Sequence, residues 1–224
     1  MDILIFVAVM VGLFLLAMVA QRLLPEKRKI SAARRVSIVG VCAAIAAVLM
    51  LFEFPLPFLA PTFYELDLSE LPVLLCGFYL GPAAAVLCEI LKIVLKLLFK
   101  GTSTMFVGEF ANFAVGCSMV LPAVIIYHMK KTRKSAFWGL VCGTFVLTAF
   151  GSTFNALYLL PTFAKLLVPM ENILAAGQAV NGKVNSVWTL VLYCVVPLNL
   201  VKGVVVSALT LLLYKRVARP LFGK

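Results

Sequence analysis

Charged residues are scarce in this chain, and long water-soluble stretches are missing. Asp, Glu, Lys and Arg make up 13% of the 224 residues, whereas 63% are hydrophobic, and the mean hydropathy is +1.10. Soluble domains contain roughly 45–50% apolar residues. Because a membrane span needs about 20 apolar residues, the composition predicts an all-α polytopic membrane protein with room for six or seven helices.

The motifs of common enzymes are also missing. There is no GxxxxGK[ST] phosphate loop, no HExxH and no GxSxG, so the sequence offers no ATPase or other recognisable catalytic site. The six cysteines lie in apolar runs without a CxxC pair, and the single histidine, His128, lies in a basic stretch expected to be a loop. We therefore expect buried thiols, no metal site, no cofactor and no enzyme activity.

Basic residues cluster in three short stretches. The net charge is +11, and fourteen of the 20 Lys and Arg residues fall within 22–35, 130–134 and 215–224. Such clusters flank spans on the cytoplasmic side, so we predict a cytoplasmic C-terminus and an N-terminus outside. No basic patch lies elsewhere, which argues against nucleic acid as a partner. The acids expected at the outer face are Asp2, Glu53, Glu65, Asp67, Glu70 and Glu171.

The first apolar run, Ile3–Ala20, is set apart from the rest. Asp2 precedes it and basic residues follow it, which favours an uncleaved helix over a signal peptide. Pro25 and the charged residues after it are expected to form a linker. We therefore divide the chain into an N-terminal helix with its linker, residues 1–35, and a six-helix membrane domain, residues 36–224.

Hydrophobic runs and breakers place the helices of that domain. The segment 52–67 has three prolines, several aromatics and no Lys or Arg, which predicts an outer lid or an aromatic belt. Ser69 is expected to cap a short helix that Gly81-Pro82 ends. The predicted helices are Val36–Leu51, Glu70–Leu80, Ala83–Phe99, Met105–Met129, Ala136–Leu160 and Val187–Tyr214, with an outer segment, Pro161–Ser186, that contains an amphipathic stretch, Met170–Val180.

Two of these helices carry polar groups inside apolar runs. Asn199 and Lys202 lie three residues apart on one face of the last helix. A lysine at this depth must snorkel, pair with an acid or bind a ligand. Asn155 on the preceding helix fits either interhelical hydrogen bonding or a ligand site. At comparable depth, the three residues together predict a polar site in the outer half of the membrane.

Other charges lie on neighbouring helices. Glu109 and Asn112 share one helical face, and Glu89, Lys92 and Lys96 form a stripe on another helix. Ion pairs of Glu89 with Lys92, or of Lys96 with Glu109, explain them without a ligand, and a proton relay is the alternative. Glu109 and Asn112 are therefore weaker binding candidates.

Small residues gather on the helix that starts the domain. Gly40 and Ala44, and likewise Ala43 and Ala47, are four residues apart. Small side chains at this spacing let helices approach closely. The pattern predicts either packing within the protein or a docking face for another membrane protein.

Four segments carry a resemblance to a known family. They read LDLSELPVLLCGFYLGP (66–82), EILKIVLKLLFKGTSTMFVGEFANFAVG (89–116), NALYLLPTF (155–163) and VPLNLVKGVVVSALTLLLYK (196–215). Their combination and order resemble the substrate-binding S components of energy-coupling-factor (ECF) vitamin transporters, in particular the riboflavin type. The helix at 3–24 departs from the six-helix pattern of that family.

The resemblance implies a bacterial plasma-membrane protein with an outward-facing vitamin pocket under a lid at 52–67. It implies three partners, a transmembrane coupling protein and two cytoplasmic ATPases, besides the surrounding lipid. It further implies that Asn155, Asn199 and Lys202 contact a flavin, and that the face at Gly40 and Ala44 docks onto the coupling protein.

The residue types suit a flavin. The isoalloxazine edge has two carbonyl acceptors and one N–H donor, which Asn and Lys can match. The ring face stacks on aromatics, for which Phe54, Phe58 and Tyr158 are candidates. We thus predict riboflavin, or a close flavin, as a transported ligand taken up through an ATP-driven complex. The alternatives are a carrier for another vitamin-like solute, ion-coupled or ECF-dependent, and, least favoured, a membrane enzyme or assembly factor.

Overall fold

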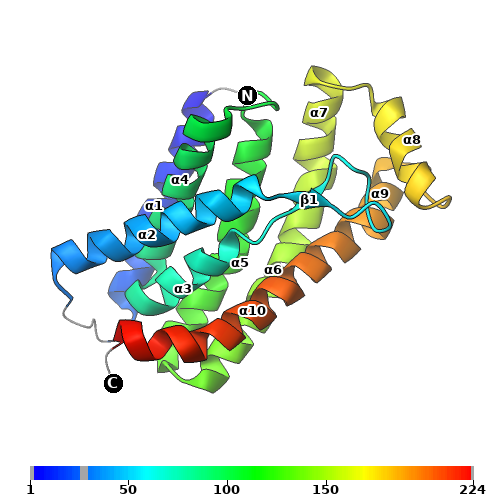
Figure 1. Ribbon diagram of the computed structural model, residues 1–224. Helices are drawn as coiled ribbons and strands as arrows, with labels where there is room; N and C mark the ends of the chain where they lie inside the picture. Colours follow the sequence, from blue (N-terminus) through cyan, green and yellow to red (C-terminus); the bar gives the residue numbers. More distant parts are fainter. Residues whose placement is uncertain (1–2, 26–29, 223–224) are drawn as a thin grey trace.

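Helices form almost the whole of the computed structural model, which describes residues 3–25 and 30–222 (Figure 1). The elements are α1 Ile3–Leu23, α2 Ala32–Leu51, β1 Phe54–Pro55, β2 Glu65–Leu66, α3 Glu70–Leu80, α4 Pro82–Lys100, α5 Val107–Lys130, α6 Arg133–Phe154, the π-helical turn η1 Asn155–Leu159, α7 Leu160–Leu166, α8 Met170–Val180, α9 Val187–Leu190, the π-helical turn η2 Val191–Val195 and α10 Val196–Phe222. Asp2, residues 27–29 and the side chains beyond Tyr214 lie outside the described part, so their predicted sides of the membrane stay predictions.

Five of the described helices are long and apolar enough to cross a membrane. They are Leu4–Leu23, Ala32–Leu51, Val107–Lys130, Arg133–Leu166 and Val187–Tyr214. Helix α4 has 19 residues but carries several charges, and α3 has only 11. Both are mostly buried by their neighbours, as a short or charged helix in a membrane must be. The prediction of an all-α membrane bundle is confirmed.

The α1–α2 connection is shorter than predicted. Helix α2 begins at Ala32, and the Ser31 hydroxyl accepts a hydrogen bond from the Arg34 amide at 3.4 Å. The serine satisfies an amide that a helix start would otherwise leave unbonded. Arg34 and Arg35 therefore belong to the first turn of α2 and not to a linker.

The short helix and its break are confirmed. Helix α3 covers Glu70–Leu80, and Gly81 turns the chain with φ +103°, a conformation that favours glycine. Ser69 does not cap α3 as predicted. Its hydroxyl accepts a hydrogen bond from the Lys92 ammonium at 3.0 Å instead.

The last two long helices run through their prolines. The predicted end at Leu160 is wrong, since α6, η1 and α7 form one helix to Leu166. Pro161 and Pro197 each follow a π-helical turn, and both lack the N–H of a regular turn. The wider turn accommodates the crowding that a proline ring causes. Such π-turns occur often at functional sites.

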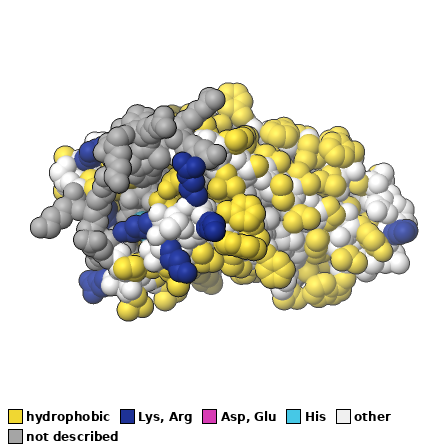
Figure 2. All heavy atoms as spheres, turned by 90° about the horizontal axis from the view of Figure 1, so that it is seen from below, with side chains coloured by type: hydrophobic (Ala, Val, Ile, Leu, Met, Phe, Trp, Pro, Cys, Tyr) yellow, Lys and Arg dark blue, Asp and Glu magenta, His cyan; other side chains and the backbone are white. Residues whose placement is uncertain are grey.

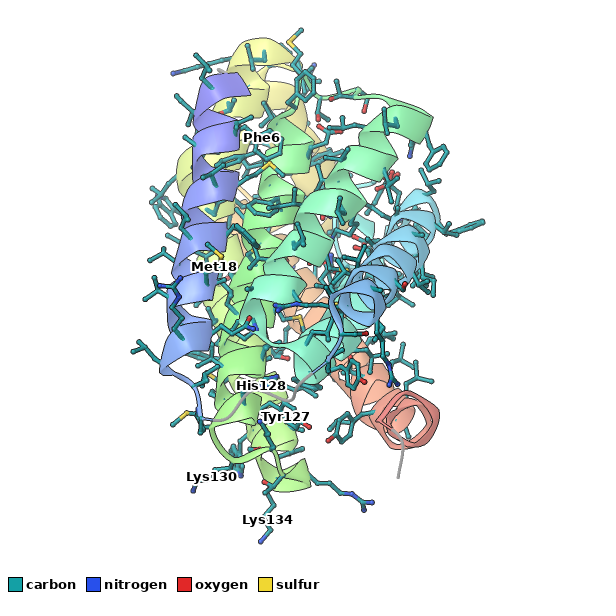
Figure 3. The ribbon with its side chains drawn as sticks, turned by 90° about the vertical axis from the view of Figure 1, so that its left-hand side faces the viewer. Phe6, Met18, Tyr127, His128, Lys130 and Lys134 are labelled. Carbon is teal, nitrogen blue, oxygen red and sulfur yellow. The ribbon has the colours of Figure 1, made fainter. Side chains whose placement is uncertain are left out.

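Helix α1 packs along α4 and α5 on the outside of the bundle (Figure 3). Its Phe6 ring meets Phe110 and Phe113 of α5, with centroids 5.5 and 6.4 Å away. Near its other end, the Gln21 side chain accepts a hydrogen bond from the Ala83 amide at 3.0 Å. The division at residue 35 stays a prediction, because α1 contacts the rest of the protein along its length.

His128 lies in the last turn of α5 and not in a loop. Its Nε2 is 3.0 Å from the Gly77 carbonyl of α3. The neighbouring Tyr127 hydroxyl is 2.7 Å from that of Tyr214 on α10. These contacts join α3, α5 and α10 at one end of the bundle.

A lid connects α2 to α3. We use this name for residues 52–67, whose ends pair as the short antiparallel ladder β1–β2, with Phe54 opposite Leu66. Its middle extends toward α8 and α9 (Figure 1). Ala60 is fully buried there, and Leu56, Leu59 and Tyr64 pack against the same apolar cluster.

Candidate functional site

Lys202 of α10 forms ion pairs with two acidic residues. Its ammonium lies 3.0 Å from Asp67 Oδ2 at the end of the lid and 3.1 Å from Glu70 Oε1 at the start of α3. Both acids are buried, at 3% and 1% exposure. Neither acid is exposed at the protein surface, and the outer side of the membrane predicted for both stays a prediction. A buried ammonium needs this compensation, because an isolated charge in hydrocarbon is costly.

A second buried lysine extends the network. Lys92 of α4 is fully buried, and its ammonium lies 2.6 Å from Glu89, 3.0 Å from Ser69 and 3.6 Å from Glu70. The predicted Glu89–Lys92 pair is thus confirmed. Asn112 of α5 donates to Asp67 Oδ2 at 3.4 Å. The members of this network, which we name the central polar cluster, are Asp67, Ser69, Glu70, Glu89, Lys92, Asn112 and Lys202.

The central polar cluster has acceptors to spare. Four buried oxygens have no hydrogen-bond partner among the described residues, and one of them, Glu89 Oε2, is in the ion pair with Lys92. The other three, Glu70 Oε2, Glu89 Oε1 and Asn112 Oδ1, have neither kind of partner. Its three carboxyl groups also outnumber its two ammonium groups. Buried acceptors without donors are unfavourable, so the cluster is suited to a molecule that brings donors.

Asn155 and Asn199 both lie near Gly151 and Ser152 at the α6–α10 interface. Asn199 donates to the Ser152 hydroxyl at 3.4 Å, one turn before Asn155. The two helices approach closely there, since a Cβ at Gly151 would lie 3.0 Å from the Asn199 amide nitrogen. Lys202 follows Asn199 by one turn on α10. The structure thus places Asn155 and Asn199 at the α6–α10 interface, and Lys202 one turn further along α10, where it meets Asp67 and Glu70.

The lid touches this interface directly. The Tyr64 hydroxyl donates to Asn155 Oδ1 at 2.8 Å, and the Asn155 amide donates to the Gly151 carbonyl at 2.9 Å. Asp67, three residues after Tyr64 at the same end of the lid, accepts a hydrogen bond from the Lys202 ammonium at 3.0 Å. The lid therefore closes over the residues that the sequence singled out.

Glu109 belongs to a different, self-contained group. It lies 2.5 Å from Lys96, and the hydroxyls of Thr102 and Thr104 donate to its other oxygen at 3.0 and 3.1 Å. The predicted Lys96–Glu109 pair is confirmed. These four residues, which we name the turn cluster, close the α4–α5 connection. Of the two weaker candidates, only Asn112 joins the central polar cluster.

The aromatic candidates lie away from the amides and Lys202. Phe54 and Phe58 are on the exposed side of the lid, with Phe58 at 78% exposure. Tyr158 packs on Phe110 of α5 and on Phe154, with centroids 5.6 and 5.0 Å away. Tyr64 is the lid aromatic that contacts Asn155, and the stacking roles of Phe54 and Phe58 stay predictions. The tyrosine was missed because nothing in the local pattern separates it from its neighbours.

The lid is also anchored at its start. Glu53 forms an ion pair with Lys100 at the end of α4. Desolvation, and then repulsion by Glu53, raise the pKa of Glu65 above its ordinary value, and Lys100 opposes this rise. This pair lies toward the protein surface, unlike the central polar cluster.

The small residues of α2 divide between two faces. Ala43 and Ala47 are buried at 1% exposure, so they serve packing within the bundle. Gly40 and Ala44 are exposed, and a Cβ at Gly40 would meet no atom within 4 Å. The docking prediction therefore reduces to Gly40 and Ala44.

Comparisons with known proteins agree with this architecture. The family model described as "ECF transporter, substrate-specific component" matches residues 34–214. Riboflavin transporter RibU of Staphylococcus aureus (strain TCH60) is 36% identical over 185 residues, which cover 83% of this chain and 90% of that protein. Riboflavin transporter FmnP of Bacillus subtilis (strain 168) is 28% identical over 81% of this chain and 90% of its own.

A solved structure of an ECF transporter S component has a similar fold. The S component of a bacterial ECF transporter superposes with a TM-score of 0.67 at 34% identity, covering 85% of this chain and 99% of that chain. Helix α1 precedes the region that the family model matches.

Proposed function

Because this chain belongs to the family of ECF transporter substrate-specific components, we propose that it is a riboflavin-binding subunit, which captures the vitamin outside the cell for ATP-driven uptake. It is a multi-pass membrane protein without an enzyme's role. The observation that carries the proposal is the convergence of Asn155, Asn199 and Lys202 under a lid that contacts two of them.

Two sets of polar groups match the two parts of a flavin, the ring and the ribityl chain. The two asparagine amides offer both donors and acceptors to the edge of the isoalloxazine ring. The central polar cluster offers buried acceptors at Glu70, Glu89 and Asn112, which suit the hydroxyl donors of the ribityl chain. A neutral ligand fits, since Lys202 is already compensated by Asp67 and Glu70.

Ligand entry requires the lid to move. The Tyr64–Asn155 hydrogen bond occupies the amide oxygen that a flavin N–H would use. Binding then exchanges one hydrogen bond for another, at small net cost. The apolar contacts of Leu56, Leu59 and Ala60 close the lid again over the bound ligand.

The partners follow from family membership and from the surface of α2. We propose that the exposed pair Gly40 and Ala44 docks onto a transmembrane coupling protein, which connects the subunit to two cytoplasmic ATPases. Close approach of small residues drives helix association in membranes. The orientation that fits has the basic stretch at Lys130–Lys134 in the cytoplasm and the lid outside.

A flavin-binding measurement tests the proposal. The full chain purified in detergent is expected to carry flavin absorbance, with riboflavin released and identified by mass spectrometry. The double variant Asn155→Ala, Asn199→Ala should weaken riboflavin affinity at least tenfold in a fluorescence-quenching titration. Asn172→Ala, an exposed asparagine on α8, is the matched control. Wild-type affinity in the double variant would overturn the assignment of the site.

A further inference from the structure

A groove lies between α1, α2 and α4, away from the flavin site. Its volume is about 450 Å³. Most of its lining is apolar and comes from all three helices, including Phe14, Met18, Val39, Leu87 and Leu91. Met18, labelled in Figure 3, lies on the flank of α1 beside α4.

One end of the groove is strongly basic. Arg22 of α1 and Arg35 of α2 both line it, although thirteen positions separate them. Within residues 3–25 and 30–222, neither guanidinium forms an ion pair with a carboxylate. Figure 2 shows the molecule from this end, where Lys and Arg side chains gather and no acidic side chain of the described residues is visible.

The wall of the groove is held in place. Gln21, which lines it beside Arg22, bonds to both sides of the Gly81 turn: it accepts from the Ala83 amide at 3.0 Å and donates to the Leu80 carbonyl at 3.5 Å. These bonds fix the end of α1 against the α3–α4 junction. The backbone next to Arg22 is therefore held in place by the fold.

We infer that this groove binds an anionic phospholipid, with the headgroup phosphate on Arg22 and Arg35. Basic pockets between spans on the cytoplasmic side are suited to anionic headgroups, and guanidinium groups bind phosphate in a bidentate manner. The part of one acyl chain nearest the headgroup lies against Phe14, Met18 and Leu87, and the rest of the lipid stays in the bilayer.

The dimensions favour a lipid chain over a protein helix. An α-helix with its side chains is roughly 10–12 Å across, whereas a volume of about 450 Å³ lies in the range of small-ligand sites. Leu87 is 37% exposed and Val36 is 72% exposed, so the groove opens toward the membrane.

The location connects the lipid to the docking surface. Gly40 lines the groove as well as the exposed face of α2. Helix α1, which supplies one wall, lies before the region shared with the family model. The lipid site is thus a feature that α1 adds beside the surface proposed for the coupling protein.

Native mass spectrometry of the delipidated full chain tests the inference. Dioleoylphosphatidylglycerol should be retained at least tenfold better than dioleoylphosphatidylcholine. Arg22→Gln with Arg35→Gln should lower phosphatidylglycerol binding by about tenfold or more, since each basic residue contributes to anionic-lipid affinity. Lys130→Gln with Lys134→Gln is the control, which removes two exposed charges from the same end of the molecule outside the groove and should change nothing (Figure 3).

A second variant tests the apolar part. Leu87→Trp fills the groove without changing its charge and should also reduce phosphatidylglycerol retention. Helical circular dichroism and a single gel-filtration peak verify folding independently of flavin binding, so failure here is distinguishable from failure of the proposed function. Equal retention of the two lipids, wild-type binding by the arginine variant, or displacement of the lipid by inorganic phosphate would each overturn the inference.

Discussion

The central polar cluster and the turn cluster use the same residue types differently. In the turn cluster, Glu109 has an ammonium on one oxygen and two threonine hydroxyls on the other. In the central polar cluster, Glu70, Glu89 and Asn112 each keep a buried oxygen without a donor. Both clusters bury charge, but only the central polar cluster, beside the lid, has spare hydrogen-bonding capacity, and the proposed site depends on this difference.

The largest effect is expected from Lys202→Met. Loss of the ammonium leaves Asp67 and Glu70 buried without their partner, and breaking a buried pair costs about 3–5 kcal/mol. We expect both the thermal midpoint in detergent and riboflavin affinity to fall strongly. Thermal unfolding and fluorescence titration measure the two effects.

A double variant separates the two roles of Lys202. Adding Asp67→Asn removes one of the uncompensated acids, so Asp67→Asn with Lys202→Met should recover part of the stability but not the affinity. Lys183→Met, an exposed lysine, is the control. Recovery of riboflavin binding together with stability would show that Lys202 has only a structural role.

Lys96→Met is expected to affect stability alone. Glu109 loses its ammonium but keeps both threonine hydroxyls, so the loss should fall at or below about 3 kcal/mol. Riboflavin affinity should stay at the wild-type value in the same titration. A clear loss of affinity in a folded Lys96→Met protein would remove the distinction between the two clusters.

Tyr64→Phe is expected to act on the lid. The variant keeps the ring and loses the hydrogen bond to Asn155, which contributes about 0.5–1.5 kcal/mol. Because this bond must break before a flavin can use the amide oxygen, riboflavin association, followed by stopped-flow fluorescence, should be about two- to tenfold faster, with little change in stability. Tyr193→Phe, on the exposed part of η2, is the control. Identical kinetics in the Tyr64 variant and the wild type would contradict a lid that contacts the site.

The smallest effect is expected from Lys100→Gln. The Glu53–Lys100 pair lies where the lysine side chain is half exposed, and such pairs contribute about 0–1 kcal/mol. Unfolding and riboflavin titration should both remain near wild type. A large loss would mean that the surface pair, and not the buried contacts, holds the lid.

Much of the fold could be predicted from the sequence. Apolar runs and the Gly81-Pro82 break gave α3 its observed bounds, and Met170–Val180 appears as α8. The Lys96–Glu109 pair was predictable because few partners are available to a charge in a membrane. The end of α7 could not be predicted. A proline usually indicates a helix end, but here a π-helical turn accommodates Pro161, and no local sequence pattern predicts a π-turn.

The candidate site was predictable in part. Asn155, Asn199 and Lys202 stood out as polar residues within apolar runs. Asp67 and Glu70 did not, because acids beside a lid fit the surface equally well. The signal that was available is Lys202 itself, whose burial requires counter-charges. Tyr64 needed the three-dimensional structure, since its partner lies 91 residues away.

A crystal structure of the full chain with riboflavin tests the central claim most directly. We predict density for the ring within hydrogen-bonding distance of Asn155, Asn199 or Lys202, with ribityl hydroxyls on the spare oxygens of the central polar cluster. Riboflavin bound elsewhere, with the Tyr64–Asn155 bond and all three spare oxygens unchanged, would contradict it.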